Sequence, residues 1–325
     1  MPWYRTSPRE FPRERWLALL EQVPDPSPYL LPEWALLWET IWPHSTAELW
    51  LYSDAADDPI AGVPLVRRRR GGLEMCFAQP GGAPHGPLGD GDALDHEAYA
   101  ELAAAVIGPR TVELAASPDW MMTPPDGWTG HSREATSWLA DLSRPPGSDL
   151  YSGFASSHRR NIARGRDRSP RVATVTQAAD VHALNTAWQG TTRASRFVLD
   201  TRRGSVLLKA FASTDALIWR TAWCDARPAA SAIFLRHRNR AVYVDGAVDR
   251  DPVYSGVGHY LFAEVLSLLN EQGVTRIDLG SGPGGNTDPG LEQFKRGWGA
   301  TPHVRTESVY RRRWYGTLRR ILGRD

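Results

Sequence analysis

Residues 241–279 have the sequence AVYVDGAVDRDPVYSGVGHYLFAEVLSLLNEQGVTRIDL, and this stretch decides the fold class. An apolar strand pattern over 241–247 leads through a loop into a predicted helix over 259–271. Four apolar side chains fall on one face of that helix, namely Leu261, Val265, Leu268 and Leu269. Gly273 then stands where a helix cap is expected, and a second strand is predicted over 275–279. A strand, a helix and another strand in this order predict a mixed α+β sheet.

The same alternation of helices and strands extends from this stretch toward both ends of the chain. In the second half it predicts helices over 149–167, 179–193 and 202–213 and strands over 173–176, 216–224 and 229–236. In the first half it predicts helices over 15–22, from Pro32 onward and over 95–106, and strands over 47–52, 60–67, 73–78 and 111–115. A strand over 304–310 and a basic tail helix follow. Both halves thus have the order helix, antiparallel strands, helix and strand, which predicts α+β architecture with a suspected duplication.

Length and one change of composition divide the chain into two domains. At about 150 residues per domain, a chain of 325 residues is expected to form two. Residues 117–147 are rich in proline, glycine, tryptophan and serine, and we interpret them as a linker with one strand near 137–142. We therefore place the domains at 1–145 and 146–310, followed by a basic tail at 311–325.

Composition excludes several classes of protein. Hydrophobic residues make up 42% of the chain and charged residues 23%, which excludes a disordered or coiled-coil protein. No apolar run approaches the ~20 residues of a membrane-spanning helix, and the polar, proline-interrupted start predicts no signal peptide. Two cysteines, Cys76 and Cys224, exclude a disulfide scaffold and a four-cysteine zinc site, and the histidines have no metal-ligand spacing. We expect a soluble cytoplasmic protein without a bound metal.

Basic charge is concentrated in two segments, although the net charge is only +1. Residues 159–171 hold six arginines against Asp167, and residues 295–325 hold Lys295 and eight arginines against two acidic residues. The remainder of the chain is therefore acidic. Concentrated basic charge indicates an anionic partner, such as RNA, or an anionic membrane face in peripheral contact with the tail. A solvated basic surface is the alternative for each segment.

Two motifs are candidates for binding an anion. Ser255-Gly-Val-Gly258 stands directly before the predicted helix, where glycines let backbone N–H groups approach a phosphate at the helix N-terminus. In the helix over 149–167, Arg160, Arg164 and Arg168 are spaced i, i+4, i+8 and form one stripe. A plain strand-to-helix turn and a solvated helix face are the structural alternatives.

Lys295 is the strongest candidate for a catalytic group. It lies in Gly290-Leu-Glu-Gln-Phe-Lys-Arg-Gly-Trp-Gly299, after a loop that can reach a cleft. The chain has only one other lysine, Lys209, so a lysine here favours a specific role, such as stabilising an oxyanion or holding a phosphate. Asp245 and Asp278 stand beside glycines at predicted strand ends, where they could accept a proton or orient an amine. The alternatives are a surface lysine beside a buried aromatic ring, and aspartates that cap loops.

The order of four short motifs resembles a known pattern of acyltransferases. The motifs are Arg160-Asn161-Ile162, Tyr243-Val-Asp-Gly-Ala247, Gly273-Val…Asp278-Leu-Gly280 and Gly290-Leu-Glu-Gln-Phe-Lys-Arg-Gly-Trp-Gly299. They are similar to the Fem-type (FemABX) branch of the GNAT acyltransferase superfamily, and equally to the broader acetyltransferase (GNAT) domain proteins grouped with cellulose-biosynthesis acetyltransferases. The first half resembles the amino-terminal domain of that family through Pro32-Glu-Trp34, Gly62-Val-Pro64 and Pro80-Gly-Gly…Gly86-Pro87. The resemblance covers most of residues 28–310.

The resemblance implies two GNAT-like domains, each with a mixed, mostly antiparallel sheet flanked by helices, and a cleft between them. It implies transfer of an acyl group to an amine. In Fem-type enzymes the donor is aminoacyl-tRNA and the acceptor a peptidoglycan precursor, and relatives act on other biosynthetic small molecules or peptides. No tightly bound cofactor is implied.

The resemblance also implies roles for single residues. Lys295 would hold the tRNA end and stabilise the oxyanion, and Phe294 would shape the site. Arg159 and Arg160 would hold donor or acceptor phosphates. The further binding candidates are Asn161, Arg164, Tyr243, Tyr254, Gly256, Gly258 and Trp298.

Two departures from the family pattern bear on the donor. Enzymes that bind acyl-CoA often carry glutamine or arginine three residues before the first glycine of the pyrophosphate loop, where this chain has Val253. Trp298 stands where phenylalanine is commoner. The favoured function is therefore an aminoacyl-tRNA-dependent N-acyltransferase that forms an amide bond. An acyl-CoA-dependent N-acetyltransferase and a non-catalytic RNA- or membrane-associated module are the alternatives.

Overall fold

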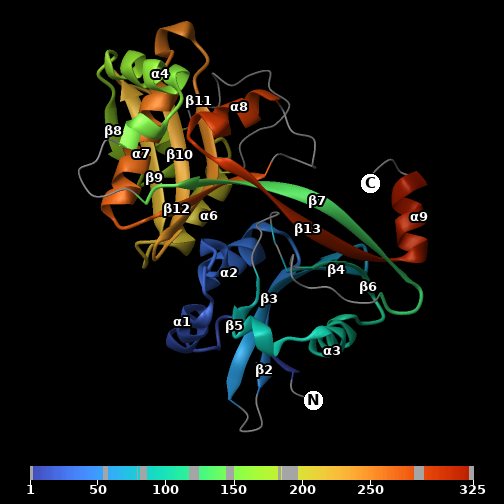
Figure 1. The fold of residues 1–325 in the computed structure, drawn as a ribbon. Coiled ribbons are helices and arrows are strands. Elements are labelled where there is room, and N and C mark those ends of the chain that lie inside the picture. Colours follow the sequence, from blue (N-terminus) through green and yellow to red (C-terminus); the bar gives the residue numbers. More distant parts are fainter. Residues whose placement is uncertain are drawn as a thin grey trace. The chain divides into compact units, whose positions relative to one another are not determined.

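The computed structural model describes residues 3–53, 58–78, 80, 86–116, 124–143, 150–181, 184, 197–281 and 289–321 of the chain. It divides into two compact units, of which the first comprises Met1–Ala135 with Arg305–Asp325 and the second Thr136–Val304. The chain leaves the first unit within strand β7 (Trp128–Asp141) and returns to it within strand β13 (Thr301–Arg312) (Figure 1). In the order of the sequence, the second unit is thus inserted into the first.

The first unit is built on a mainly antiparallel sheet with helices on both faces. Its strand order is β1 (Trp3–Thr6), β2 (Ser45–Ser53), β3 (Pro59–Arg70), β4 (Leu73–Phe77), β6 (Thr111–Ala115) and the end of β13, and β5 (Leu88–Gly89) pairs with β3. Among the described strand pairs of this unit, the pair formed by β4 and β6 is the parallel one. Helix α3 (His96–Val106) covers the face that carries Val63 and Leu65. Helices α1 (Arg13–Gln22) and α2 (Pro32–Ile41) lie against the other face.

Helix α9 (Arg313–Ile321) packs on β4 and β6 in the first unit. Arg311 Nε and Arg319 Nη1 lie 2.8 and 2.9 Å from the same carboxylate oxygen of Glu113. Tyr315 Oη lies 3.8 Å from the sulfur of a β4 methionine. Trp314 on the same helix is exposed. Within the described ranges, no helix is both long enough and apolar enough to cross a membrane.

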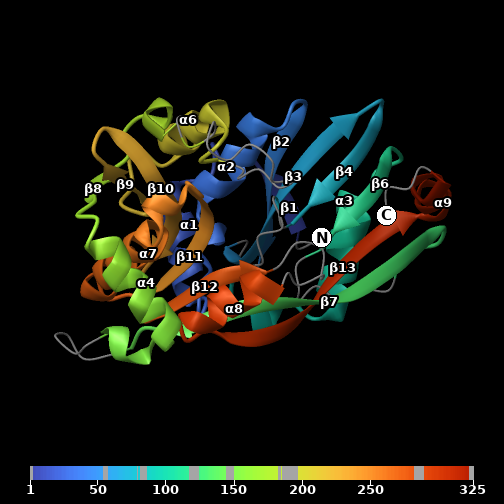
Figure 2. The same cartoon turned by 90° about the horizontal axis from the view of Figure 1, so that it is seen from above.

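The sheet of the second unit has the strand order β7–β12–β11–β10–β9–β8. The strands are β8 (Arg171–Thr174), β9 (Leu217–Cys224), β10 (Arg227–His237), β11 (Arg240–Val248) and β12 (Arg276–Ser281). β11 and β12 are parallel and are connected by helix α7 (Val257–Glu271), whereas the other described pairs are antiparallel. Helices α4 (Ser156–Arg166) and α7 cover one face, and Figure 2 shows α6 (Thr201–Ala210) on the other.

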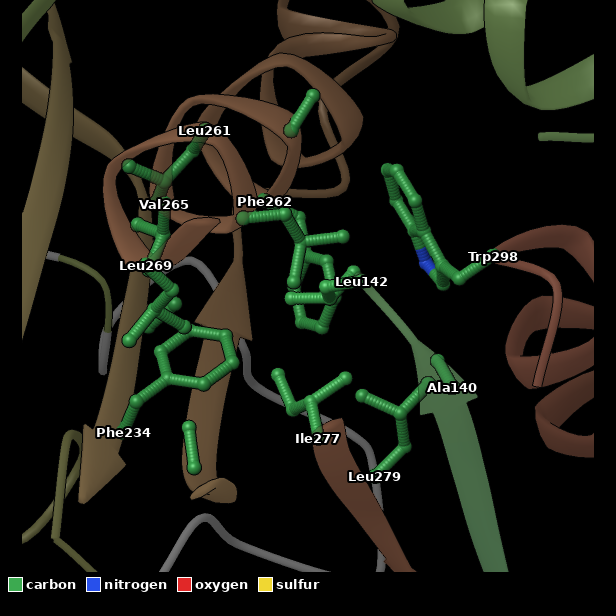
Figure 3. Packing of buried hydrophobic residues seen from close by; sticks show 14 of the residues in the cluster. Ala140, Leu142, Phe234, Leu261, Phe262, Val265, Leu269, Ile277, Leu279 and Trp298 are labelled. Atoms are coloured by element: carbon green, nitrogen blue, oxygen red, sulfur yellow. The ribbon is translucent and has the colours of Figure 1, made fainter. Parts of the chain in front are cut away.

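Alternation along the strands builds the core of the second unit. Phe234 on β10 and Ile277 on β12 point to the face that α7 covers. Three side chains of α7 pack over them, namely Leu261, Val265 and Leu269 (Figure 3). At one edge of this core the rings of Phe262 and Trp298 stack with centroids 4.8 Å apart. Trp298 directly follows helix α8 (Pro289–Gly297), so the core holds the helix that carries the candidate lysine.

The expected α+β architecture with a mostly antiparallel sheet is confirmed, and most predicted elements overlap observed ones. The helix predicted over 149–167 begins only at Ser156, because Leu150–Gly153 form a short 3-10 turn and Ala155 is extended. Strand β1 and helix α8 were not predicted. Apart from 179–181 and 184, the helix predicted over 179–193 lies outside the described residues, as do 282–288 of the glycine loop and Gly81-Gly82 of the amino-terminal motif.

The units divide at other positions than the sequence indicates. We place the boundaries at 145/146 and 310/311, whereas the compact units meet at 135/136 and 304/305. The physical reason is that β7 starts at Trp128, inside the expected linker, and that β13 is a long strand that begins at Thr301. Both divisions therefore fall inside strands, where backbone hydrogen bonding continues and composition gives no signal.

A buried ion pair joins β2 to β3 in the first unit. Arg67 Nε lies 2.7 Å from Oε1 of Glu48, and Arg67 Nη1 lies 3.1 Å from Oε2 of Glu74. Arg67 Nη2 also donates to the carbonyl oxygen of Val106, at the end of α3, over 3.2 Å. Burial favours the neutral form of Glu48, but the hydrogen bond and charge of Arg67 outweigh it and hold the pKa of this carboxyl below its usual value. The ionised pair therefore ties two strands and a helix together.

The substitution Arg67→Met should lower the free energy of unfolding by about 3 kcal/mol, because Glu48 would remain buried with only the exposed Arg5, 3.5 Å away, as a cationic partner. Urea denaturation at pH 7 measures this loss. The control is Arg69→Met, since the exposed Arg69 guanidinium also bonds to Glu74, at 2.9 Å. This control should change the free energy of unfolding by less than about 0.5 kcal/mol. Equal losses in the two variants would contradict a stabilising role for the buried pair.

Candidate functional site

Helix α4 crosses the start of α7 at two glycines. Gly256, the N-cap residue of α7, has φ +90°, and a Cβ atom placed on it would lie 2.5 Å from the carbonyl oxygen of Asn161. A Cβ atom on Gly165 would collide with the carbonyl group of Gly256. Both positions therefore require glycine, because the two backbones approach too closely for a side chain. This contact places the predicted glycine loop directly beside the arginine-rich helix.

The first turn of α7 is the second element of the site. A Cβ atom on Gly258 would lie 2.6 Å from Cγ1 of Val248, so glycine also lets the helix approach β11. The N-cap residue of α7 is a glycine and supplies no side-chain acceptor to the first N–H groups of the helix. Tyr254, just before the loop, packs against the core and under the guanidinium of Arg227 at 5.7 Å. The expected anion-binding groups are thus present, with one side of the loop covered by α4.

The arginines of α4 differ in what they contact. Arg159 donates to the carbonyl oxygens of Phe154 and Ser152 and so fastens the segment before the helix. Arg164 Nη1 lies 3.3 Å from Oγ of Ser255, which ties the arginine stripe to the glycine loop. Arg160 is exposed. Within the described part of the chain, none of these guanidinium groups forms an ion pair with a carboxylate.

Lys295 lies in the last turn of α8 and is buried, with 3% of its surface exposed. Its Nζ donates to the carbonyl oxygen of Gly280, at the end of β12, over 2.6 Å. Burial lowers the pKa of Lys295 to about 8, although the charges of Asp278 and Glu292 favour the protonated form. Lys295 is therefore an ammonium group that changes its charge near physiological pH.

The rest of the lysine motif is explained by the packing of one histidine. His158 Nε2 donates to the carbonyl oxygen of Phe294 over 2.9 Å, and the His158 ring fills the space where a side chain at Gly297 would be. Its ring centroid lies 4.7 Å from that of Trp298 and 4.7 Å from that of His259. The residues from Phe294 to Trp298 therefore pack closely against His158 of α4 and His259 of α7.

Sequence reasoning missed this histidine pair. Burial lowers the pKa of His158, even though its bond to Phe294 favours the charged form. Burial, together with the nearby His158, lowers the pKa of His259 to about 4. Both rings are therefore neutral at pH 7. The two positions are 101 residues apart in the sequence, and no spacing signal connects them.

The Tyr243-Val-Asp-Gly246 motif contains a β-bulge that sends its side chains to different faces. Phe234 pairs with Tyr243, whereas the preceding Ile233 pairs with Asp245, so Val244 is the extra residue. Tyr243 lies on the core face, where its hydroxyl reaches over Gly246 and its ring lies 5.3 Å from that of Phe262. Gly246 leaves room for that hydroxyl.

Asp245 points to the face of the sheet that carries Ile233. Its carboxylate accepts backbone N–H bonds from Phe197, Val198 and Gly246 at 2.6, 3.1 and 2.9 Å. A carboxylate that accepts three backbone N–H groups caps a loop. Loop capping is the alternative to a catalytic role that the sequence left open for this aspartate. The geometry does not support the expectation that Asp245 accepts a proton from a substrate.

Asp278 lies where β11 and β12 separate. The parallel pairing joins Arg240–Val242 to Arg276–Asp278 and ends there. Asp278 Oδ1 accepts the N–H of Gly280 over 2.7 Å, and Gly280 has φ +75°. This turn presents the Gly280 carbonyl to Lys295. Asp278 and Lys295 are therefore brought together, as are Phe294 and Trp298, whereas Asp245 serves a different contact.

Metal binding has no support among the described residues, where no group of three histidine, cysteine or acidic side chains could hold an ion. His158 and His259 belong to the ring cluster described above, and His85 lies outside the described residues.

A family model described as an acetyltransferase (GNAT) domain matches residues 154–296. This range contains α4, the glycine loop, α7, β12 and Lys295. No curated protein sequence matches the chain.

The fold is similar to that of several solved structures. FemX is 11% identical, with 94% of this chain and 96% of that chain covered and a TM-score of 0.67. L-PGS from Bacillus licheniformis is 14% identical, with 97% of each chain covered and a TM-score of 0.54. A tandem GNAT protein from the clavulanic acid biosynthesis pathway is 14% identical, with 95% and 97% covered and a TM-score of 0.53.

These similarities confirm the GNAT-like fold and the resemblance to the Fem branch. They extend over nearly the whole chain, whereas the family model covers the part that carries the site. Residues 154–296 therefore form an acyltransferase domain of the GNAT type, within a chain whose fold is similar to that of FemX.

Proposed function

We propose that this acyltransferase takes an aminoacyl group from aminoacyl-tRNA and transfers it to an amine, forming an amide bond. The observation that carries the proposal is the basic face of α4 beside the start of α7. Arg160 and Arg164 are exposed there without a carboxylate partner in the described ranges, and Arg164 reaches Ser255. A polyanion such as tRNA offers several phosphates to a face of this kind.

The resemblance to Fem-type enzymes supports the same donor. The four motifs that carry the resemblance lie in or beside the site described above, and FemX shares the fold of nearly the whole chain. The acceptor we propose is a peptidoglycan precursor or another amine-bearing small molecule or peptide.

The reaction would proceed by attack of the neutral acceptor amine on the ester carbonyl carbon of the donor. The N–C bond forms, and the carbonyl oxygen becomes an oxyanion. The C–O bond to the tRNA ribose then breaks, and the ribose oxygen takes up the proton that the amine loses. An amide and a deacylated tRNA result.

Lys295 is the group that we assign to the oxyanion. Its ammonium carries two N–H groups besides the one that Gly280 accepts, and with a pKa of about 8 it is mainly protonated at pH 7. Asp278 lies close enough to favour the charged form, and we assign it a positioning role. Phe294 contributes through its backbone, because its carbonyl fixes the helix one residue before Lys295.

A binding experiment at one fixed salt concentration tests the donor. A pool of aminoacylated tRNA, the same pool deacylated and acetyl-CoA are compared as ligands. We expect the aminoacylated tRNA to bind more tightly than the deacylated pool. Equal affinity for the two pools, with saturable binding of acetyl-CoA, would contradict the proposal.

The second candidate is an acyl-CoA-dependent N-acetyltransferase. It is favoured by the N-terminus of α7, where the N-cap residue is a glycine without a capping side chain, because such a terminus suits a pyrophosphate. Val253 is exposed at the position where the family pattern favours glutamine or arginine, and this departure argues against acyl-CoA.

The substitution Lys295→Met should lower the rate of acyl transfer by about 10²–10³-fold, the usual cost of removing one donor from an oxyanion site. Its thermal stability at pH 7 should be equal to or above that of the wild type, because the variant no longer buries a charge. Lys209→Met, at the exposed second lysine, is the control and should keep full activity. Unchanged transfer by Lys295→Met would refute the assignment.

Transfer by the wild type should decline as the pH rises through about 8, because Lys295 loses its proton there. Labelling the lysine side chains with carbon-13 makes this titration visible by NMR, since the chain has two lysines and Lys209→Met removes one resonance. The resonance that remains should titrate near pH 8, at the same pH as the decline in rate. If the Lys295 resonance instead titrates at the ordinary lysine value, loss of the Lys295 proton is not the cause of the decline in rate.

The double variant Arg160→Ala/Arg164→Ala should weaken binding of aminoacylated tRNA by about tenfold or more, because two phosphate contacts are lost. Its unfolding temperature should change little, since the Arg160 and Arg164 side chains are exposed. Arg202→Ala/Arg203→Ala on α6 is the charge-matched control, on the other face of the sheet. Equal weakening by both double variants would indicate general attraction to the protein surface.

A further inference from the structure

The turn between β3 and β4 forms a cleft in the first unit, outside the GNAT domain. The cleft has a volume of about 580 Å³. It is lined by three consecutive arginines and both glycines of the turn, together with the turn after α2: Pro43, His44, Arg68, Arg69, Arg70, Gly71 and Gly72. A concave surface with several cationic side chains favours the binding of an anionic ligand.

Because side chains alternate between the two faces of a strand, neighbouring arginines have different contacts. Arg67 and Arg69 point to the α3 face, where Glu48 and Glu74 neutralise them. Arg68 points to the α2 face, where its guanidinium lies 5.5 Å from the ring centroid of Trp42. Arg70 shares that face by alternation and is exposed. The charge at the cleft that no described carboxylate neutralises is therefore that of Arg68 and Arg70.

Arg68 carries an unused hydrogen-bond donor. Its Nε is buried and has no partner among the described residues, although its guanidinium is already held by stacking on Trp42. Nε is therefore closed to solvent, so Arg68 can reach a ligand in the cleft only through its terminal guanidinium nitrogens. No described carboxylate pairs with Arg68 or Arg70.

The turn itself leaves room for a ligand. Gly71 and Gly72 have φ values of +57° and +78°, and a Cβ atom on either would have no neighbour within 4 Å. Among the described residues, no atom therefore occupies the space into which a side chain at either glycine would project. The N–H of Arg69 donates to the carbonyl oxygen of His44 over 2.9 Å. This hydrogen bond holds the turn that carries the His44 imidazole beside the arginines.

We infer that this cleft binds the phosphate group of a small phosphorylated ligand. Arg68 and Arg70 supply forked N–H donors that match phosphate oxygens, and Trp42 holds one of them in place. The volume suits a molecule up to about the size of a nucleotide, and a concave site favours a compact ligand over an extended polyanion. The site lies in a different unit from α4, and it does not depend on the donor that we propose.

Calorimetric titration with inorganic pyrophosphate tests the inference, and inorganic phosphate and a nucleoside diphosphate serve as further probes. We expect saturable binding of pyrophosphate to the full chain and to Arg160→Ala/Arg164→Ala. That double variant removes the other candidate anion site, so failure here and failure of the proposed donor can be told apart. Persistence of binding in the double variant supports the cleft. Its complete loss there would overturn the inference.

Variants of the turn locate the binding. Arg70→Gln should weaken pyrophosphate binding by about tenfold, the value of one charged hydrogen bond. Arg69→Gln is the matched control, because the Arg69 guanidinium, unlike that of Arg70, is already neutralised by Glu74. Arg68→Gln should weaken binding at least as much, with its unfolding temperature measured alongside because Trp42 contacts it. Equal weakening by Arg69→Gln and Arg70→Gln would refute a built site, as would binding of an RNA oligonucleotide through Arg70 with none of the three small probes.

Discussion

The close crossing of α4 over the start of α7 is the contact on which the candidate site depends. Gly165 and Gly256 permit it, and any side chain at either position would force the helices apart. The same approach brings His158 of α4 against His259 of α7, with ring centroids 4.7 Å apart. His158 in turn binds the carbonyl oxygen of Phe294 and thereby orients the turn of α8 that bears Lys295. Two glycines thus control the position of a lysine more than a hundred residues from the first of them.

The regular part of the fold could be predicted because periodicity is a local property. The amphipathic helix over 259–271 and the strand over 111–115 both lie where their apolar spacing indicates. The environment of Lys295 could not be predicted, since it depends on the Gly280 carbonyl and on a histidine from another helix. The bulge at Val244 was also hidden, because one extra residue in a strand leaves the apolar pattern almost unchanged while it turns Asp245 to the other face.

The chain uses arginine almost everywhere and lysine only twice, and the structure gives a physical reason for one of the two. A guanidinium keeps its charge at any physiological pH, which suits Arg67 in its buried pair and the exposed stripe of α4. An ammonium can lose its proton when it is buried, as the pKa of about 8 for Lys295 illustrates. Arginine at position 295 would have a fixed charge and a planar fork that the single Gly280 carbonyl cannot match.

The interrupted first unit has a consequence for biosynthesis. Its sheet includes the end of β13, and α9 packs on it, yet both are made after the whole second unit. Residues 136–304 form a continuous segment, so the GNAT domain can fold on the ribosome while the edge of β6 that β13 later covers is still unpaired. An uncovered strand edge is a template for association with other chains. The interval between synthesis of β6 and of β13 is therefore the stage at which the nascent protein is most exposed to aggregation and most in need of a chaperone.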